Sequence, residues 1–271
     1  MSSYKSIALG VIALGAGSVF TSGAQATDPP GASSSWRLAW SDEFDGASID
    51  PAAWTYDLGA GGWGNGESQA YTSRPENARI EDGCLVIEAR REKYQGSYYT
   101  SARLKTFGLK EFGYGRVEAR MKVPAGQGLW PAFWMLGADF PRKSWPACGE
   151  IDIMEYIGKD PRTVYGTVHG PGYSGSSGPG GRLRLDADVA QDFHIFAIER
   201  ESDRIRWYCD GEQYFSISKG DQGANEWAFE KDFFIILNLA VGGAWPGPVA
   251  LDTPFPARLL VDYVRVYEKA D

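Results

Sequence analysis

The stretch Gly149-Glu150-Ile151-Asp152-Ile153-Met154-Glu155 places three carboxylates within six residues, among large apolar side chains. The apolar residues and the glycine at its start predict a β-strand, in which side chains alternate between two faces. Glu150 and Asp152 then share a face, whereas Glu155, five residues after Glu150, points the other way. One extra residue between Asp152 and Glu155, forming a β-bulge, would return Glu155 to the first face. The sequence therefore predicts a bulged strand with all three carboxylates on one side.

A carboxylate trio on one sheet face is costly as pure structure, because buried charges need partners. It suits acid–base chemistry, because burial and mutual repulsion push the pKa values of the carboxyls apart. The alternative is an exposed acidic strand edge, which the intervening apolar residues disfavour. Glycoside hydrolysis uses two carboxyls: about 5–5.5 Å between them gives retention through a covalent glycosyl-enzyme, and roughly 6.5–9.5 Å gives inversion. Glu150 and Glu155 as neighbours favour retention, with Asp152 holding a proton or a hydrogen bond between them.

The rest of the chain consists of short apolar or alternating runs separated by Gly, Pro, Asn and Asp. The run over 114–123 alternates charged and apolar residues and predicts a half-buried antiparallel strand. The run over 233–241 is apolar on both faces except at Asn238 and predicts a central strand. We expect further strands over 37–40, 84–90, 98–105, 164–169, 194–200, 205–209 and 259–267. Many short strands with turn signals between them predict an all-β sandwich and exclude a doubly wound α/β fold.

The N-terminus has the features of an export signal. Lys5 supplies a positive charge, residues 7–20 are apolar, and Ala24-Gln25-Ala26 is a small-x-small cleavage site. We therefore expect a signal peptide over 1–26, a flexible linker over 27–35 and one catalytic domain over 36–268. The apolar run is too short for a comfortable membrane span, so a secreted, extracellular protein with no membrane association after cleavage is predicted.

Composition narrows the range of partners and chemistries. The formal net charge is -8 over 271 residues and no basic run occurs, so nucleic acid is not an expected partner. A monomer is expected. The chain has neither a His-Glu-x-x-His zinc motif nor a Gly-x-Ser-x-Gly nucleophile elbow. The ten tryptophans are a surplus that suits a polysaccharide ligand, because indole rings stack on the apolar faces of sugars.

The three cysteines of this exported chain leave at least one thiol unpaired. Cys84 and Cys209 both lie in strand-like runs, and a disulfide between them is one alternative. Cys148 lies two residues before Glu150, and no histidine is nearby in sequence to activate it. We interpret Cys148 as a buried structural thiol rather than a nucleophile.

Two further segments leave alternatives open. The glycine-rich loop over 61–67 either presents Trp63, Asn65 and Glu67 to a ligand or is an ordinary surface turn. His169 ends a predicted strand, and it either reaches the ligand groove or is a structural imidazole. Trp145 lies in a loop beside the carboxylate strand and is the tryptophan best placed to contact a ligand.

The motif Glu150-x-Asp152-x-x-Glu155 resembles the bulged form found in glycoside hydrolase family 16. Further segments resemble the laminarinase branch of that family, the endo-1,3-β-glucanases: Ser41-Asp42-Glu43-Phe44, Gly62-Trp63-Gly64-Asn65, Trp130-Pro131-Ala132-Phe133-Trp134, 237–243 and 261–267. The resemblance covers about 36–267. It implies a concanavalin A-like β-jelly roll of two curved antiparallel sheets.

The same resemblance implies roles for particular residues. Glu150 would be the nucleophile, Asp152 an assisting acid and Glu155 the general acid/base. The residues implied to bind substrate are Trp134 and Trp145 next to the cleaved bond, with Asn65, Arg103, Trp130 and His169 as further groove residues. No cofactor is implied for catalysis. A structural calcium is implied at Glu43, the carbonyl of Gly83, and Asp262, because oxygen ligands suit a hard cation.

The resemblance implies a secreted, retaining endo-β-glucanase that hydrolyses 1,3-β-glucan and extends to mixed-linkage 1,3-1,4-β-glucan. One alternative is a family sibling that acts on agarose, carrageenan or another galactan. A second alternative is a non-catalytic β-glucan-binding protein. Such relatives lack the paired glutamates, and this chain keeps Glu150 and Glu155.

Overall fold

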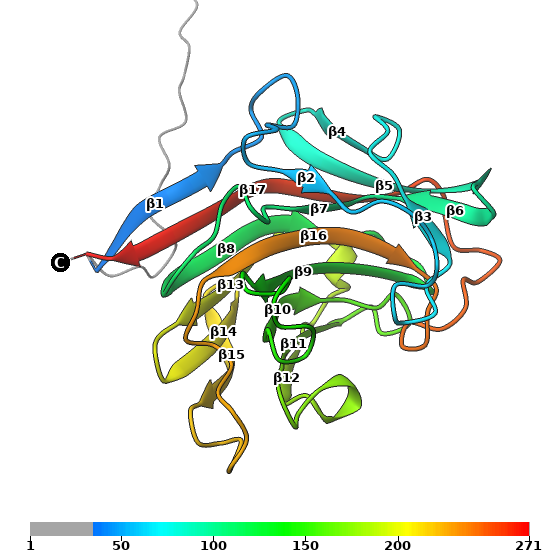
Figure 1. Cartoon of the computed structure of the whole chain (residues 1–271). Helices are drawn as coiled ribbons and strands as arrows, with labels where there is room; N and C mark the ends of the chain where they lie inside the picture. Colours follow the sequence, from blue (N-terminus) through cyan, green and yellow to red (C-terminus); the bar gives the residue numbers. More distant parts are fainter. Residues whose placement is uncertain (1–34, 271) are drawn as a thin grey trace, which may run out of the picture.

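The computed structural model describes residues 35–270, and almost all regular structure in that range is β-strand (Figure 1). The strands are β1 Trp36–Asp42, β2 Thr55–Tyr56, β3 Gln69–Tyr71, β4 Ala78–Glu81, β5 Cys84–Tyr94, β6 Ser97–Ser101, β7 Arg103–Lys105, β8 Gly115–Lys122, β9 Leu129–Gly137, β10 Glu150–Glu155, β11 Thr163–His169, β12 Gly180–Arg184, β13 His194–Arg200, β14 Arg204–Cys209, β15 Glu212–Ser218, β16 Phe233–Val241 and β17 Ala257–Lys269. Two short 3-10 turns occur, η1 at Gly175–Ser177 and η2 at Val189–Gln191. In this range no helix is both long and apolar enough to cross a bilayer. The predicted signal peptide and most of the predicted linker lie outside the described residues.

The described strands form two sheets that pack face to face. The ten-stranded sheet has the order β15-β14-β13-β8-β17-β5-β6-β3, with β1 added on β17 and β4 added on β5. The seven-stranded sheet has the order β12-β11-β10-β9-β16-β7-β2. Neighbouring strands are antiparallel except for the parallel pair β3 and β6. The expected all-β jelly-roll sandwich is confirmed, and β10, the carboxylate strand, is an inner strand of the seven-stranded sheet.

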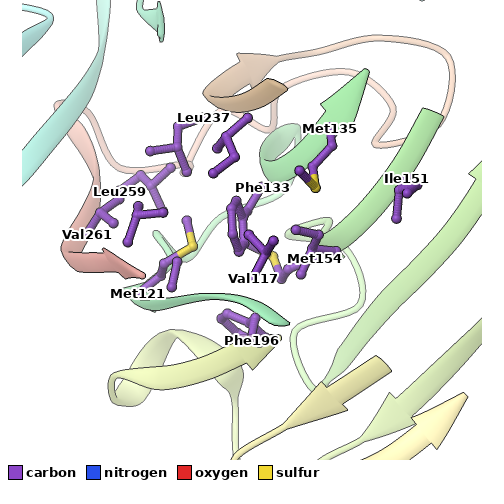
Figure 2. Packing of buried hydrophobic residues seen from close by; sticks show 14 of the residues in the cluster. Val117, Met121, Phe133, Met135, Ile151, Met154, Phe196, Leu237, Leu259 and Val261 are labelled. Carbon is purple, nitrogen blue, oxygen red and sulfur yellow. The ribbon is translucent and has the colours of Figure 1, made fainter. Parts of the chain in front are cut away.

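The core lies between the two sheets and is built from the alternate side chains that each sheet turns inward. Val117 and Met121 of β8 face Phe133 of β9, Met154 of β10 and Leu237 of β16 (Figure 2). Each of these side chains is almost completely buried. Burying a side chain of this size contributes about 1.5–3 kcal/mol, so the sandwich holds β9, β10 and β16 firmly from behind. Their opposite faces are left to form a surface.

The register of β10 contains the predicted bulge. Asp152 pairs with Trp134 and Met154 pairs with the adjacent Phe133, so Ile153 is the extra residue. The pairing with β11 shifts at the same place. Ile153 and Met154 both join the core, and Glu155 therefore returns to the face that carries Asp152.

A side chain from the other sheet supports the bulge. The backbone carbonyl of Asp152 accepts a hydrogen bond of 2.8 Å from Nε1 of Trp207, a fully buried residue of β14. A bulge disrupts the regular ladder and leaves backbone groups to be satisfied elsewhere. Trp207 supplies such a partner from across the core.

Two strand predictions need correction. The run over 98–105 is two strands, because the chain passes at Ala102 from β6 in the ten-stranded sheet to β7 in the seven-stranded sheet. The run over 114–123 was predicted to be half-buried, yet Arg116 and Glu118 on its charged face are buried as well. Arg116 Nε lies 2.8 Å from Glu118 Oε2, so the ion pair satisfies both charges.

The three cysteines form no disulfide. The alternative of a disulfide between Cys84 and Cys209 is therefore wrong. Cys148 is fully buried. Burial raises the pKa of the Cys148 thiol to about 11, with a further increase from the charge of Glu150. Because the thiolate is the nucleophilic form, Cys148 is inert at neutral pH, as the structural interpretation requires.

Candidate active site

The three carboxylates of β10 open into one cleft on the outward face of the seven-stranded sheet. The cleft has a volume of about 610 Å³. It is lined by Asp57, Trp63, Gly64, Asn65, Glu67, Arg103, Lys105, Phe107, Trp130, Ala132, Trp134, Leu136, Phe140, Pro141, Trp145, Glu150, Asp152, Glu155, Phe234, Asn238 and Ala240. Strands β7, β9, β10 and β16 form its floor, and the loops before β3 and after β9 form its walls. The cleft thus combines aromatic surface with three acids on one strand, as polysaccharide hydrolysis needs.

His169, which pairs with Glu150 across the ladder from β11, approaches two of the three carboxylates. Its Nε2 lies 3.2 Å from Asp152 Oδ2 and 3.6 Å from Glu150 Oε1. Both distances are short enough for electrostatic contact. The geometry at Asp152 Oδ2 is not that of a hydrogen bond. The Nδ1 atom is buried and has no hydrogen-bond partner among residues 35–270. His169 therefore faces the carboxylates through Nε2 alone.

Burial dominates the electrostatics of the trio. Burial, and next the charge of Asp152, raises the pKa of Glu150 well above its ordinary value. Burial raises the pKa of Asp152 to about 8. Burial and the charge of Asp152 also raise the pKa of Glu155 well above its ordinary value. The three carboxyls therefore share protons at neutral pH, as acid–base catalysis requires.

Two of the carboxyls differ in their immediate partners. Glu155 Oε1 accepts a hydrogen bond of 3.1 Å from Nε1 of Trp130. Glu150 has no such donor in the described part of the chain. The nearby His169 and Arg103 act against burial and lower the pKa of Glu150. The two glutamates on one strand face thus have different surroundings, which is the condition for different roles.

Five of the six predicted substrate residues line the cleft, namely Trp130, Trp134, Trp145, Asn65 and Arg103. Trp145 is 43% exposed, which is high for a tryptophan and leaves its ring open to a ligand. The guanidinium of Arg103 stacks on Trp63 at 5.2 Å and on Trp134 at 4.6 Å. Arg103 therefore lies between two aromatic rings of the wall and the floor.

His169 is the sixth predicted substrate residue, and it does not line the cleft. It lies beside Glu150 and Asp152, and its ring is 6.1 Å from that of Trp145. The α-carbon of Gly178 packs so closely that a side chain there would come within 2.5 Å of the imidazole. His169 therefore contacts two of the three carboxylates, and its contact with a ligand stays a prediction.

Several groove residues were not predicted as site residues. Glu67 was mentioned only with the glycine-rich loop, and its carboxylate accepts hydrogen bonds from Asn65 at 3.1 Å and Gln69 at 2.6 Å. Asn238 accepts a hydrogen bond of 2.7 Å from Nε1 of Trp134. The signal for Asn238 was its position as a single polar residue in an apolar strand. The aromatic residues Phe107, Phe140 and Phe234 had no distinguishing signal.

The residues implied for calcium have cationic partners in the structure. Glu43 accepts hydrogen bonds of 3.0 and 2.8 Å from Arg265, and Asp262 lies 2.8 Å from Arg120. Gly83 occupies the turn between β4 and β5. A cation at this position would compete with both arginines for the carboxylates, so its binding would require these two ion pairs to open. Calcium stays a prediction, and no step of the chemistry depends on it.

Two groups of described side chains are close enough to share a metal ion. The first is Glu150, Asp152 and His169, which belongs to the carboxylate strand and its neighbour. The second is His194, Cys209 and Asp210. Cys209 is buried in the core, so its sulfur is poorly placed for an ion that enters from solvent. We assign no metal to either group.

Comparison with known proteins gives consistent results. A sequence model of Glycosyl hydrolases family 16 matches residues 65–264. A beta-glucanase of Rhodothermus marinus is 47% identical over 244 residues, which are 86% of this chain and 85% of that protein. The endo-beta-1,3-glucanase structure from Pyrococcus furiosus is 50% identical with a TM-score of 0.84, over 87% of this chain and 95% of that chain. The catalytic domain of a laminarinase from Thermotoga petrophila RKU-1 is 50% identical with a TM-score of 0.83, over 87% of this chain and 99% of that chain.

Proposed function

Because the chain belongs to glycosyl hydrolase family 16, we propose that it is an endo-1,3-β-glucanase that cleaves internal bonds of β-glucan with retention of configuration. The names of its similar relatives support the substrate class. The observation that carries the proposal is the bulge at Ile153, which turns Glu150, Asp152 and Glu155 into one aromatic cleft. Without that extra residue, Glu155 would face the core.

In the first step, Glu155 donates its proton to the glycosidic oxygen while the carboxylate of Glu150 attacks the anomeric carbon. The bond between that carbon and the oxygen breaks, the reducing-end fragment leaves as an alcohol, and an ester joins the sugar to Glu150. The raised pKa of Glu155 keeps its proton available for donation. His169 and Arg103 favour the ionised form of Glu150.

In the second step, Glu155 takes a proton from a water molecule, which attacks the anomeric carbon and releases Glu150. Two displacements at one carbon restore its original configuration. Asp152, whose pKa is raised to about 8, carries a proton at neutral pH and lies between the two glutamates in sequence. A proton on Asp152 avoids a third negative charge beside Glu150 and can be donated to the nucleophile as a hydrogen bond.

The test is hydrolysis of laminarin, followed by NMR of the anomeric proton in the earliest products. The β-anomer should appear first and then equilibrate with the α-anomer. A 2-deoxy-2-fluoro laminaribiosyl substrate with a good leaving group should add the mass of one fluorinated disaccharide to a peptide that contains Glu150. Early α-anomer would sink the retaining mechanism, and a Glu150→Gln variant with wild-type turnover would sink the assignment of the nucleophile.

The alternatives give different product profiles on a substrate panel. We expect laminarin to be cleaved fastest, with mixed-linkage 1,3-1,4-β-glucan as a second substrate. An enzyme that cleaved agarose or carrageenan and left laminarin intact would be a galactanase. A chain that bound laminarin without producing reducing ends would be a glucan-binding protein, which the retained pair Glu150 and Glu155 disfavours.

We also propose that the protein is exported, acts extracellularly as a monomer and needs no cofactor for catalysis. Lys5, the apolar run over 7–20 and the Ala24-Gln25-Ala26 site support export. N-terminal sequencing of the protein from culture medium should start near Thr27. Structural calcium is a further proposal, and a rise in melting temperature on adding CaCl2 to EDTA-treated protein would support it.

A further inference from the structure

Asn238 is the polar exception in the apolar strand β16, and its side chain joins two parts of the cleft. Its Oδ1 accepts a hydrogen bond of 2.7 Å from Nε1 of Trp134 on β9. Its Nδ2 donates to the hydroxyl of Tyr71 at 3.2 Å. The Tyr71 hydroxyl in turn donates to Glu67 Oε2 at 3.3 Å. A continuous chain of hydrogen bonds thus runs from the indole of Trp134 to the carboxylate of Glu67.

The direction of donation in this chain is determined by its two ends. The indole nitrogen of Trp134 can only donate, and an ionised carboxylate can only accept. Asn238 must therefore present its oxygen to Trp134 and its amide group to Tyr71, and Tyr71 must give its proton to Glu67. Gln69 and Asn65 also donate to Glu67. The carboxylate of Glu67 is the common acceptor that orients every other member of the chain.

Trp134 is also held from its ring face, and it lies next to the catalytic strand. Arg103 stacks on its ring at 4.6 Å, and an ion pair of 2.9 Å with Asp57 holds Arg103. Trp134 is the cross-strand partner of Asp152, so its indole borders the reacting bond on the cleft floor. A sugar that stacks on this ring is oriented by whatever orients the ring.

We propose that Glu67 is a positioning residue that fixes the indole of Trp134 through Tyr71 and Asn238, and thereby sets how tightly the enzyme holds a glucose unit beside the reacting bond. This inference rests on the proposed glucanase function. Tyr71 is buried and does not line the cleft, so it transmits the orientation without touching the ligand. These hydrogen bonds also connect the glycine-rich loop to β9 and β16, which assigns a ligand-related role to that loop.

Glu67 itself lines the cleft, so direct contact with a sugar is the competing explanation. Tyr71→Phe separates the two, because it breaks the chain and leaves the Glu67 carboxylate in place. If the hydrogen bonds through Tyr71 and Asn238 position Trp134, Glu67→Gln and Tyr71→Phe should each raise KM for laminarin about tenfold. This corresponds to a loss of about 1.4 kcal/mol of binding free energy. The double variant should be no worse than either single variant, and kcat should stay within about twofold.

A second readout needs no substrate. In a 15N-labelled protein, the indole N–H resonance of Trp134, identified from its absence in Trp134→Phe, should shift and exchange faster with solvent in both variants. The resonance of Trp227, whose indole donates to the backbone carbonyl of Ser202, is the internal reference and should not move. Tyr98→Phe, an exposed residue that does not line the cleft, is the matched control and should change neither KM nor the Trp134 resonance.

Two results would overturn the proposal. A KM increase in Glu67→Gln without one in Tyr71→Phe would assign Glu67 to direct sugar contact. A lower melting temperature in both variants, with KM and the Trp134 resonance unchanged, would leave the chain with a structural role alone. A wild-type protein that is inactive on laminarin would refute the proposed function instead, and the resonance experiment would still test the positioning of Trp134.

Discussion

Buried carboxylates occur in both sheets of the sandwich, and their partners differ. Glu118 and Glu88 of the ten-stranded sheet are 0% and 1% exposed. Glu118 lies 2.8 Å from Arg116, and Glu88 pairs with Arg79, Arg90 and Arg258. In the seven-stranded sheet, the carboxylate trio contacts His169 and the indole of Trp130. No arginine within residues 35–270 forms a salt bridge with that trio.

The difference teaches that burial alone does not identify a catalytic carboxylate. A buried acid with a fixed arginine partner stays ionised and serves the fold. A buried acid without one keeps a proton near neutral pH and can exchange it with a substrate. Charge removal should therefore lower stability in the ten-stranded sheet, whereas in the seven-stranded sheet it should lower turnover or remove a pH-dependent loss of stability. The following variants test this difference in order of expected size.

The largest effect is expected for Glu155→Gln. Loss of the general acid should lower kcat on laminarin by about 10²–10⁴ while the melting temperature stays near the wild-type value. On an aryl glucoside with a dinitrophenolate leaving group, which needs no protonation, the first step should be almost unimpaired and an initial burst of phenol should appear. Equal losses on both substrates, without a burst, would argue against Glu155 as the acid.

The second effect is on stability and concerns Glu118→Gln. Removing one partner leaves Arg116 buried with a weaker partner, so the free energy of unfolding should fall by about 3 kcal/mol. Urea unfolding measures it, and kcat and KM should not change. Glu268→Gln is the matched control, because its pair with Arg37 is exposed and should contribute less than about 1 kcal/mol. A Glu118→Gln variant as stable as wild type would break the comparison.

The third effect depends on pH and concerns Asp152→Asn. Because folding raises the pKa of Asp152 to about 8, the folded state binds its proton more tightly than the unfolded state. Its contribution to stability is fully present below about pH 4 and is lost as pH rises toward 8. The asparagine variant avoids this loss and should gain roughly 2 kcal/mol of stability relative to wild type between pH 4 and pH 8, which equals about one and a half pKa units at about 1.4 kcal/mol each.

Urea unfolding at pH 4, 6 and 8 checks this prediction, and the stability difference between variant and wild type should grow with pH. A difference that is constant across the three pH values would mean that Asp152 is ionised in the folded protein. In that case the trio would resemble the paired carboxylates of the other sheet.

The smallest effect is expected for Trp145→Ala. The exposed ring contributes little to the core, so the free energy of unfolding should change by less than about 0.5 kcal/mol. Loss of a stacking surface for sugar should raise KM for laminarin about fivefold, or about 1 kcal/mol. Leu251→Ala, at an exposed position that does not line the cleft, is the control and should leave both quantities unchanged. An unchanged KM in Trp145→Ala would remove this ring from the binding surface.

The sequence predicted the features that follow from local alternation. The bulge followed from the parity of Glu150, Asp152 and Glu155, because an odd spacing cannot keep residues on one face of a regular strand. The apolar run over 233–241 was predicted with the bounds that β16 has in the structure. In both places, a single rule about side-chain direction determines the answer.

Features that depend on contacts between distant segments were not predictable in this way. Burial of Glu118 depends on Arg116 and on Tyr263 and Tyr267 of β17, which approach it only in the folded sheet. His169 ends its strand as expected, but the packing of Gly178 against its ring holds it beside the carboxylates. No alternation pattern records such contacts. The same holds for the route from Glu67 to Trp134, which joins residues from three separate segments.

The hydrogen bond from Trp207 to the carbonyl of Asp152 couples the two layers mechanically. Trp207 belongs to the ten-stranded sheet, and the carbonyl belongs to the bulge that aims the acids. If heating lets one layer slide over the other, this bond is stretched and the bulge loses its support before the strands separate. Heat inactivation should therefore precede the loss of β-structure, and the width of that temperature gap would report how rigidly the layers are joined.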